Sequence, residues 1–380
     1  MNKVKILLIL FCGLFLTKGY GQVSDSTLIL TRQSFMLIPD TVVRIELTNS
    51  LKGFLKAKNN ANGTNPYIHS DYLKKNEEPF QWLSGAEGKL ENGKDLFRPT
   101  LLASLPLGDE KYIIKLAYMG VGSGKETEPI LNLIATLEAR KINGNYFFYN
   151  AVEYNTRLYN VSKVGNIKYI YPNKLDLKKA KQMDDFNSSF AKKFKTEPLE
   201  VTYYKCDDPE QLFKMLGYDY IRNMYFSLSG GLAEWWTNTL YAGNNSELHE
   251  HEVVHFYTSR LFKDKPRIVD EGYATYIGGS GGIDISKLAI FAKRYIAKNP
   301  NDDINDLSTS FKVRVEGGVP ITYILSGLVC KDVEEKQGIE GIKKLFIPKP
   351  QEDYFSTLKR VNGIEKEEFS GYIKKLLDKY

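Results

Sequence analysis

Three of the four histidines of this 380-residue chain lie within seven residues that begin at His249. The last five of these residues follow the pattern H-E-x-x-H, with His251, Glu252 and His255 at its fixed positions. On a helix, the two histidines of the pattern are one turn apart on one face and can bind one zinc ion, and Glu252 lies beside them as a base for the metal's water. His249 would point about 200° away from His251, so we expect it to be exposed or behind the site and not a ligand.

A zinc ion that acts as a Lewis acid usually has three protein ligands and one open position, so a third ligand is needed downstream. We expect the histidine helix to run to about Lys263, because Pro266 is tolerated at a helix start but not in a helix interior. Glu271 would then lie one turn into a second helix, within reach of the metal. The predicted ligands are therefore His251, His255 and Glu271, and the predicted cofactor is Zn²⁺.

Residues 251–255, Pro266 and the sequence E-G-Y-A-T-Y from Glu271 to Tyr276 resemble the HExxH … P-x-x-x-x-E-G-x-A-x-Y arrangement of gluzincin, or peptidase-MA-like, zinc metallopeptidase domains. The resemblance covers roughly residues 175–380. It implies a metallopeptidase that acts on a peptide or protein substrate. The third ligand follows the second histidine by 16 positions, which is a shorter spacing than in thermolysin and the aminopeptidases, so the loop between the two helices must be tight.

The resemblance also bears on specificity. Gluzincin aminopeptidases carry G-x-M-E-N on an edge strand before the zinc helix, and its glutamate binds the free amine of the substrate. The matching residues here run from Gly230 to Glu234, with Ala233 at the position of that glutamate. Glu234 is one residue later and, on a strand, would point to the opposite face. The resemblance therefore implies an edge strand that binds substrate at Gly231 and Leu232 but lacks the aminopeptidase anchor.

Hydrolysis also needs a group that stabilises the oxyanion. In the aminopeptidases a tyrosine that follows a V-P turn, just ahead of a helix, has this role, and Val319 to Tyr323 resemble that context. Tyr323 is therefore the second predicted catalytic residue beside Glu252, the general base that would pass its proton to the leaving amine. Tyr323 could instead be a packing residue, and Tyr273 or Tyr276 could take the role or only wall the site.

Two alternatives to a peptidase stay open at this point. The chain could be a catalytically weak or inactive binding module that contains zinc, or an aminopeptidase with a non-standard amine anchor, for which Glu234 is the candidate. A purely structural zinc site is disfavoured, because such sites use four protein ligands and three are found here. The residues identify a metal and a base, and only the resemblance identifies the bond that is cleaved.

The N-terminus predicts export. Lys3 and Lys5 precede an apolar run from Ile6 to Leu16, which is too short to span a bilayer. We interpret residues 1–21 as a signal peptide that is cleaved before Gln22, and we expect a periplasmic or secreted protein. No later segment approaches 18 uninterrupted apolar residues, so we expect no stable membrane insertion after the signal peptide is removed.

Composition excludes some partners. Removal of the signal peptide takes away three lysines and no acidic residue, which lowers the formal net charge from +6 to +3. There is no long basic tract, so we expect no nucleic acid partner. The mature chain keeps Cys206 and Cys330, which could form one disulfide or remain two separately buried thiols. Nothing in the sequence fixes the oligomeric state.

The residue patterns along the chain predict helices and strands that position the site. They indicate an α+β chain with two domains, residues 22–173 and 174–380. The first should hold a helix over residues 42–58 and an antiparallel β-meander, with strands near residues 112–116, 131–139, 146–154 and 167–171. The second should begin with a helix over residues 175–195 and a strand over residues 199–204. The resemblance adds a small mixed sheet, the zinc helix and a mostly helical C-terminal half.

His69 is the lone histidine of the first domain and is assigned no chemistry. That domain could recognise a substrate or partner or shield the cleft.

Overall fold

The computed structural model describes residues 28–58, 60, 64–76, 79–80, 83–90, 92–121, 129–222, 224 and 230–380. The expected signal peptide and its cleavage position lie outside these residues. Within them the chain is α+β, as predicted, with two β-sheets and a mainly helical C-terminal half. No helix in the described part of the chain is long and apolar enough to cross a membrane.

The contacts within the chain define two compact units. The first consists of Met1–Tyr159 and Pro209–Leu228, and the second of Asn160–Asp208 and Ser229–Tyr380. The sequence suggested one boundary near Asn173. Instead, the chain enters the second unit at Asn160, returns to the first for a short segment and then completes the second.

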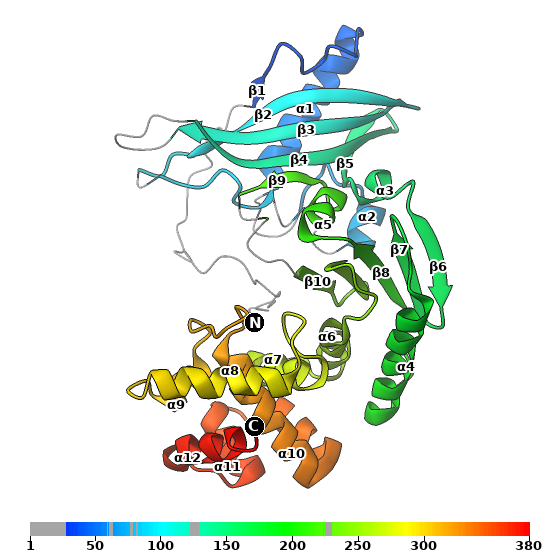
Figure 1. The fold of residues 1–380 in the computed structure, drawn as a ribbon. Coiled ribbons are helices and arrows are strands. Elements are labelled where there is room, and N and C mark those ends of the chain that lie inside the picture. Colours follow the sequence, from blue (N-terminus) through cyan, green and yellow to red (C-terminus); the bar gives the residue numbers. More distant parts are fainter. Residues whose placement is uncertain are drawn as a thin grey trace. The chain divides into compact units, whose positions relative to one another are not determined.

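The first unit is built on a six-stranded sheet in which β2, β3, β4 and β5 form an antiparallel meander, and β3, β4 and β5 correspond to three of its predicted strands (Figure 1). The turn between β4 and β5 contains Asn143 and Gly144, with φ of 51° and 81°, which is the backbone of a two-residue hairpin turn. A short strand, β1, pairs in parallel with β2, and β9 pairs with β4. The strands are β1 Ile29–Leu30, β2 Phe97–Gly108, β3 Lys111–Val121, β4 Pro129–Ile142, β5 Asn145–Asn150 and β9 Tyr218–Ile221.

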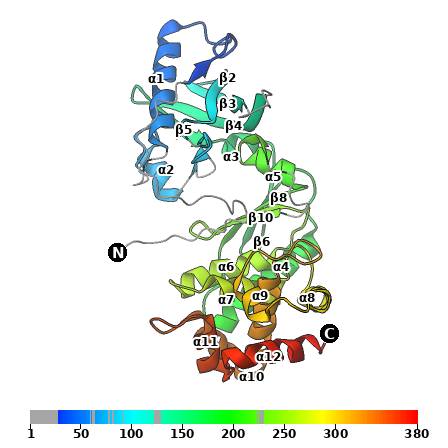
Figure 2. The ribbon, with the colours of Figure 1, turned by 90° about the vertical axis from the view of Figure 1, so that its left-hand side faces the viewer.

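Helix α1, Thr41–Ala57, covers one face of this sheet and confirms the predicted helix (Figures 1 and 2). It begins at Asp40, whose carboxylate accepts hydrogen bonds from two backbone N–H groups of the first turn. Leu47, Leu51 and Phe54 are spaced along one side of the helix and are buried in the core of the unit. The remaining helices of this unit are α2 Ser70–Lys75, α3 Val152–Asn155 and α5 Pro209–Met215.

Two strand predictions need correction, and one strand was missed. The strand expected over residues 146–154 ends at Asn150, because α3 occupies Val152–Asn155. The strand at residues 167–171 does not belong to the meander, because β7 pairs in parallel with β8 in the sheet of the second unit. Strand β2 was not predicted, since Pro99 and Pro106 lie within it and proline normally excludes an inner strand. Its pairing with β3 shifts register at two places, one of them between Pro106 and Gly108, which allows the second proline to stay in the strand.

The second unit has a five-stranded mixed sheet in the order β10-β11-β8-β7-β6, so β10 is an edge strand, as predicted. Helix α4 begins at Asp176 and confirms the helix expected over residues 175–195. The buried face of α4 belongs to the same hydrophobic core as the sheet and the C-terminal helices. These first elements are β6 Asn160–Val164, β7 Ile167–Tyr171, α4 Leu177–Phe194, β8 Val201–Cys206, β10 Gly230–Glu234 and β11 Thr239–Gly243.

The C-terminal half of the second unit is helical and contributes most of its core. The longest helix, α10, is kinked at Gly338, where φ is 64°. Cys206 and Cys330 are both buried and are not joined by a disulfide, so of the two alternatives the described chain has two separate thiols. The helices are α6 Glu250–Leu261, α7 Arg267–Gly278, α8 Ile285–Lys298, α9 Ile304–Thr309, α10 Ile321–Phe346, α11 Tyr354–Asn362 and α12 Lys366–Leu377.

Candidate metal centre

The two helices that carry the H-E-x-x-H pattern and Glu271 are joined by a short loop, as expected. Helix α6 ends at Leu261, and α7 begins at Arg267 with Pro266 as its N-cap. The end of α7 lies very close to the start of α6, since a Cβ atom on Gly278 would be 2.3 Å from the backbone nitrogen of His251. Only glycine permits this approach, which brings the two helices together at the metal ligands.

His251, His255 and Glu271 form a group that could hold a metal ion. Their ligand atoms all lie within 4.8 Å of one another. The Nε2 atoms of His251 and His255 are 3.6 and 3.7 Å from the same carboxylate oxygen, Oε2 of Glu271. His255 and Glu271 are buried, with 4% and 1% of their surface exposed, and His251 is partly buried.

Each of the two histidines has its other ring nitrogen engaged. Nδ1 of His251 is 2.6 Å from the carbonyl oxygen of Gly279, and Nδ1 of His255 is 2.9 Å from Oδ2 of Asp270. A carbonyl and a carboxylate only accept, so both Nδ1 atoms must donate a proton. This fixes the tautomer in which a neutral ring presents the lone pair of Nε2 to the group.

The atoms that converge on this point do not satisfy one another. Nε2 of His255 and both carboxylate oxygens of Glu271 are buried without a hydrogen-bond partner among the described residues. Separations of 3.6 and 3.7 Å are too long for hydrogen bonds. They are close to the separation of about 3.4 Å that two ligand atoms have when bonds of about 2.1 Å meet at a tetrahedral angle on zinc. Two nitrogens and a carboxylate are therefore a donor set that could hold a metal ion, and the two histidine–glutamate separations are near those of a zinc site.

Asp270 holds His255 in place and is itself held by two further groups. Its Oδ1 accepts a hydrogen bond of 2.6 Å from the hydroxyl of Thr258, and its Oδ2 is 2.6 Å from Nζ of Lys265. Lys265 also donates to the hydroxyl of Thr258. Burial opposes ionisation of Asp270, but His255 and Lys265 outweigh it and hold the pKa of this carboxyl well below its usual range. Asp270 is thus a fixed negative charge behind His255.

Opposite charges also control the protonation of the ligand side chains. Burial lowers the pKa of His251, but the carboxylates of Glu271 and Glu252 more than offset this and raise it to about 9. Burial likewise opposes ionisation of Glu271, but His251 and His255 keep its pKa below the usual range. Without a metal, the Glu271 carboxylate is therefore ionised and the nearby His251 ring is protonated. The carboxylate thus stabilises a positive charge at this position.

Glu252 lies beside the ligand group and has only 5% of its surface exposed. Its Oε2 has no hydrogen-bond partner in the described chain, and its Oε1 is 3.9 Å from Nε2 of His249. His249 is the N-cap residue of α6 and is not in the group that could bind a metal, as expected. It is not exposed, however, because its ring packs on β10, where a Cβ atom on Gly231 would be 1.8 Å from Nε2 of His249.

Edge strand β10 carries the two predicted substrate-binding residues, Gly231 and Leu232, both partly buried. Its register with β11 places Ala233 opposite Leu240 and Glu234 opposite Thr239. Ala233 packs against the core of the unit. Glu234 instead accepts a hydrogen bond from the hydroxyl of Thr237, so its carboxylate is engaged at the end of its own strand.

Tyr323 lies in the first turn of α10 and has 3% of its surface exposed. Burial and then the charge of Glu271 raise the pKa of its hydroxyl, whereas the guanidinium of Arg267 lowers it. The charges of the candidate ligand Glu271 and of Arg267 therefore act on this hydroxyl in opposite directions. For Tyr273 and Tyr276, burial and then the charge of Glu334 raise the pKa values of the hydroxyls. Of the three tyrosines, only Tyr323 is affected by a ligand carboxylate.

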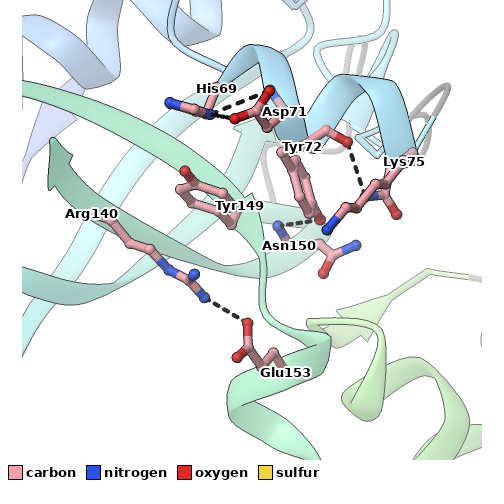
Figure 3. A pocket seen from close by; sticks show the side chains of 9 residues that line it. His69, Asp71, Tyr72, Lys75, Arg140, Tyr149, Asn150 and Glu153 are labelled. Carbon is pink, nitrogen blue, oxygen red and sulfur yellow. Dashed lines mark hydrogen bonds and ion pairs between the residues drawn. The ribbon is translucent and has the colours of Figure 1, made fainter.

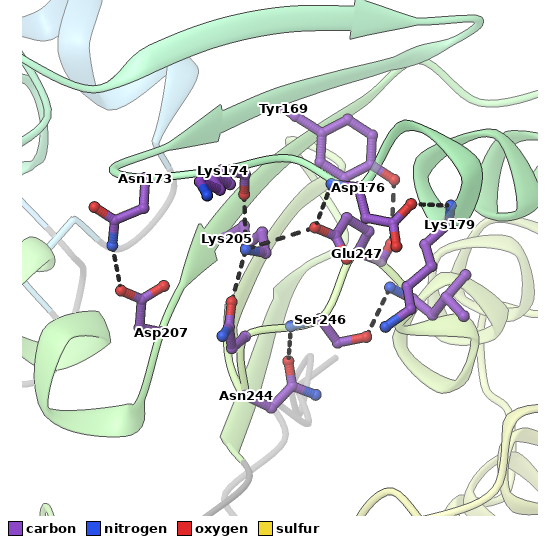
Figure 4. Close-up of polar contacts among 12 residues, drawn as sticks. Tyr169, Asn173, Lys174, Asp176, Lys179, Lys205, Asp207, Asn244, Ser246 and Glu247 are labelled. Atoms are coloured by element: carbon purple, nitrogen blue, oxygen red, sulfur yellow. Dashed lines mark hydrogen bonds and ion pairs between the residues drawn. The ribbon is translucent and has the colours of Figure 1, made fainter.

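A buried polar network holds the loop that leads into α6 (Figure 4). Nζ of Lys205 on β8 lies 3.5 Å from Oε1 of Glu247 and donates to Oδ1 of Asn245. Glu247 also accepts a hydrogen bond from the backbone N–H of Asp176, the N-cap of α4, and its carbonyl accepts one from the hydroxyl of Tyr169 on β7. The loop two residues before His249 is therefore fixed to the sheet and to α4.

The first unit has a separate polar pocket of about 350 Å³ (Figure 3). His69 caps α2 by accepting the N–H of Asp71, and the guanidinium of Arg140 lies 4.4 Å above the ring of Tyr149 and pairs with Glu153. The pocket is lined by His69, Asp71, Tyr72, Lys75, Asn76, Arg140, Tyr149, Asn150 and Glu153.

Several residues that shape the centre were not identified from the sequence. Asp270, Lys265 and Gly279 bind side chains of the centre through contacts that depend on how α6 and α7 cross. The one available signal was an acidic residue directly before the third ligand. A comparison of the chain with models of known protein families, with curated proteins and with solved structures finds no match.

Proposed function

We propose that this chain is an exported, zinc-dependent metallopeptidase of the gluzincin type. The observation that carries the proposal is the convergence of buried, unpartnered ligand atoms from His251, His255 and Glu271, with the tautomers of both histidines fixed by acceptors on Nδ1. Nitrogen and carboxylate donors in a set of three are typical of catalytic zinc sites, which keep one position open. Export is proposed from the signal-peptide pattern of residues 1–21.

The chemistry needs a metal, a base and an oxyanion donor. Zinc held by the three ligands would supply Lewis acidity toward water and a carbonyl group. Glu252 would accept the proton of the attacking water and pass it to the leaving amine, a role that suits a carboxylate with a free oxygen beside the ligands. The hydroxyl of Tyr323 would donate a hydrogen bond to the oxyanion.

Substrate would bind along β10. An edge strand can pair with an extended peptide, and Gly231 and Leu232 lie on this strand next to the histidine helix. Ala233 offers no charge to a free amine, and Glu234 is engaged by Thr237. We therefore propose cleavage within peptides rather than removal of single N-terminal residues.

The test combines metal analysis with cleavage of a random peptide library in free and N-acetylated forms. We expect about one zinc per chain, cleavage that a chelator abolishes and zinc restores, and acetylated peptides cut at least as well as free ones. Glu252→Gln should keep the zinc and lose hydrolysis by several orders of magnitude. Wild-type activity in this variant would remove Glu252 as the base, and loss of cleavage on acetylation would identify an aminopeptidase.

Zinc without any cleavage would favour the binding module over the enzyme. In that case the peptides that the zinc-loaded protein retains would define the ligand. Absence of zinc after reconstitution would overturn the proposal altogether.

A further inference from the structure

Arg267 stands next to the metal ligand Glu271 in the fold. It is the first residue of α7, four positions before Glu271, and residues four apart lie on the same face of a helix about 6 Å apart. Helical side chains lean toward the N-terminus of the helix. The guanidinium therefore extends from the ligand face of α7, beyond the metal group.

An aromatic surface orients this guanidinium. It lies 4.5 Å from the centroid of the Phe311 ring, and Phe311 in turn contacts the ring of Tyr323, with 6.0 Å between centroids. Tyr323 is linked to Arg267 through this ring of Phe311. The arginine is therefore held in one direction, beside the residue proposed to contact the oxyanion.

Arg267 has no acidic partner among the described residues. It is only partly exposed, and no carboxylate in that part of the chain lies within ion-pair distance of it. By contrast, Arg294 and Arg360 of the same unit pair with Glu316 and Glu352. A partly buried guanidinium without a carboxylate is most strongly stabilised by one that a ligand brings, because the planar fork binds both oxygens at once.

We propose that Arg267 determines specificity by binding a carboxylate of the substrate close to the scissile bond. Arg267 is one helical turn away from Glu271, and its side chain adds further reach. An extended peptide advances about 3.3 Å per residue, so the bound carboxylate would lie within about two residues of the cleaved bond. The substrate class is therefore peptides with an acidic side chain there or with a free C-terminus there. This inference rests on the proposed peptidase function.

The test uses the same peptide library as free acids and as C-terminal amides, with cleavage sites read by mass spectrometry. Wild type should show an enrichment of about 10- to 100-fold, either for Asp and Glu within two residues of the cut or for cuts near a free C-terminus that amidation abolishes. The first result assigns a side chain and the second the terminal carboxylate. No enrichment of either kind overturns the proposal.

Variants identify the residue responsible. Arg267→Met should remove the enrichment while retaining zinc and the cleavage rate of neutral peptides, and Arg267→Lys should retain part of it. Arg294→Met is the matched control, because Arg294 also lies over a phenylalanine ring, at 5.5 Å, on the same unit. Tyr323→Phe should lower the rate without changing the preference. Retention of the preference in Arg267→Met overturns the proposal.

Failure of the peptidase proposal can be told apart from failure of this one. If wild type cleaves nothing, the zinc-loaded Glu252→Gln protein is incubated with the library and the retained peptides are sequenced. Retention that depends on a carboxylate and is lost in Arg267→Met supports the role of Arg267 in binding. Equal retention of acidic and neutral peptides overturns it.

Discussion

The pocket of the first unit and the metal centre of the second contain the same kinds of side chain and differ in how these are satisfied. In the pocket, His69 accepts a backbone N–H, and Arg140 pairs with Glu153, which is 81% exposed at its side chain. In the centre, His255 and Glu271 are almost fully buried and have polar atoms without a hydrogen-bond partner in the described part of the chain. Both regions would be found by a search for clustered charges.

The difference lies in the cost of leaving polar atoms unpaired. A buried polar atom without a partner costs about 1–3 kcal/mol, and more when it is charged, so such atoms persist where something else is bound. Paired charges at a surface cost little and imply little. The candidate metal centre has buried atoms without a partner among the described residues, whereas Arg140, Glu153 and Asp71 of the pocket each have a charged partner.

The largest expected effect separates the two regions by metal affinity. His251→Ala, His255→Ala and Glu271→Ala should each weaken zinc binding by more than about 100-fold, because even groups behind the ligands contribute about 10- to 100-fold. His69→Ala in the pocket is the control and should leave affinity unchanged. Zinc content after dialysis against a competing chelator measures this. Full zinc occupancy in Glu271→Ala would exclude Glu271 from the ligand set.

A second comparison uses one acid from each region, each beside a histidine. Asp270→Asn removes the negative charge behind His255 and should weaken zinc binding by about 10- to 100-fold. Asp71→Asn beside His69, where the two side chains are 4.0 Å apart, should leave zinc affinity at the wild-type value. Chelator competition gives both constants. Equal affinities in the two variants would mean that Asp270 supports the fold and not the metal.

A third comparison concerns the ion pairs themselves. Lys265→Met removes a partly buried cation that contacts both Asp270 and Thr258, and we expect the free energy of unfolding to fall by about 1.5–3 kcal/mol. Glu153→Gln removes one partner of Arg140 at the surface and should cost less than about 1 kcal/mol. Urea unfolding of the zinc-free proteins measures both. A larger loss in Glu153→Gln would reverse the distinction drawn between the two regions.

The smallest expected effect is the pH dependence of the pocket. The hydrogen bond from Lys74 holds the pKa of Asp71 below its usual range. Its contribution to stability is therefore present above the unfolded pKa of about 3.9 and is lost as the pH falls through the lower folded value. The difference in Tm between wild type and Asp71→Asn should shrink on acidification below about pH 4. A carboxyl titration by NMR with a midpoint above the usual value would contradict this.

The ligand group was predictable because it depends on local spacing. The interval of four between His251 and His255 defines one helix face, and Pro266 marks where the next helix starts. Asp270 was not predictable as a partner of His255, although it directly precedes Glu271. Its role depends on the crossing of α6 and α7, which Gly278 permits by its lack of a side chain.

The sheets show the opposite case. The residue pattern predicted β3, β4, β5, β7 and β8, because a strand is a local structure. The partner of a strand is not local. Residues 167–171 have the same pattern as the meander strands but pair with β8, and β9 pairs with β4 across more than eighty residues of chain. Register and sheet membership follow from packing that the pattern does not contain.

The return of Pro209–Leu228 to the first unit affects how the chain can fold. Three peptide connections join the two units, after Tyr159, after Asp208 and after Leu228. The first unit cannot complete its sheet until β9 has been synthesised, by which time β6, β7, α4 and β8 of the second unit are already present. A fragment cut at Asn173 would separate β7 from β8 and β9 from β4. The segments of the two units therefore alternate along the chain, so neither unit corresponds to one continuous stretch of sequence.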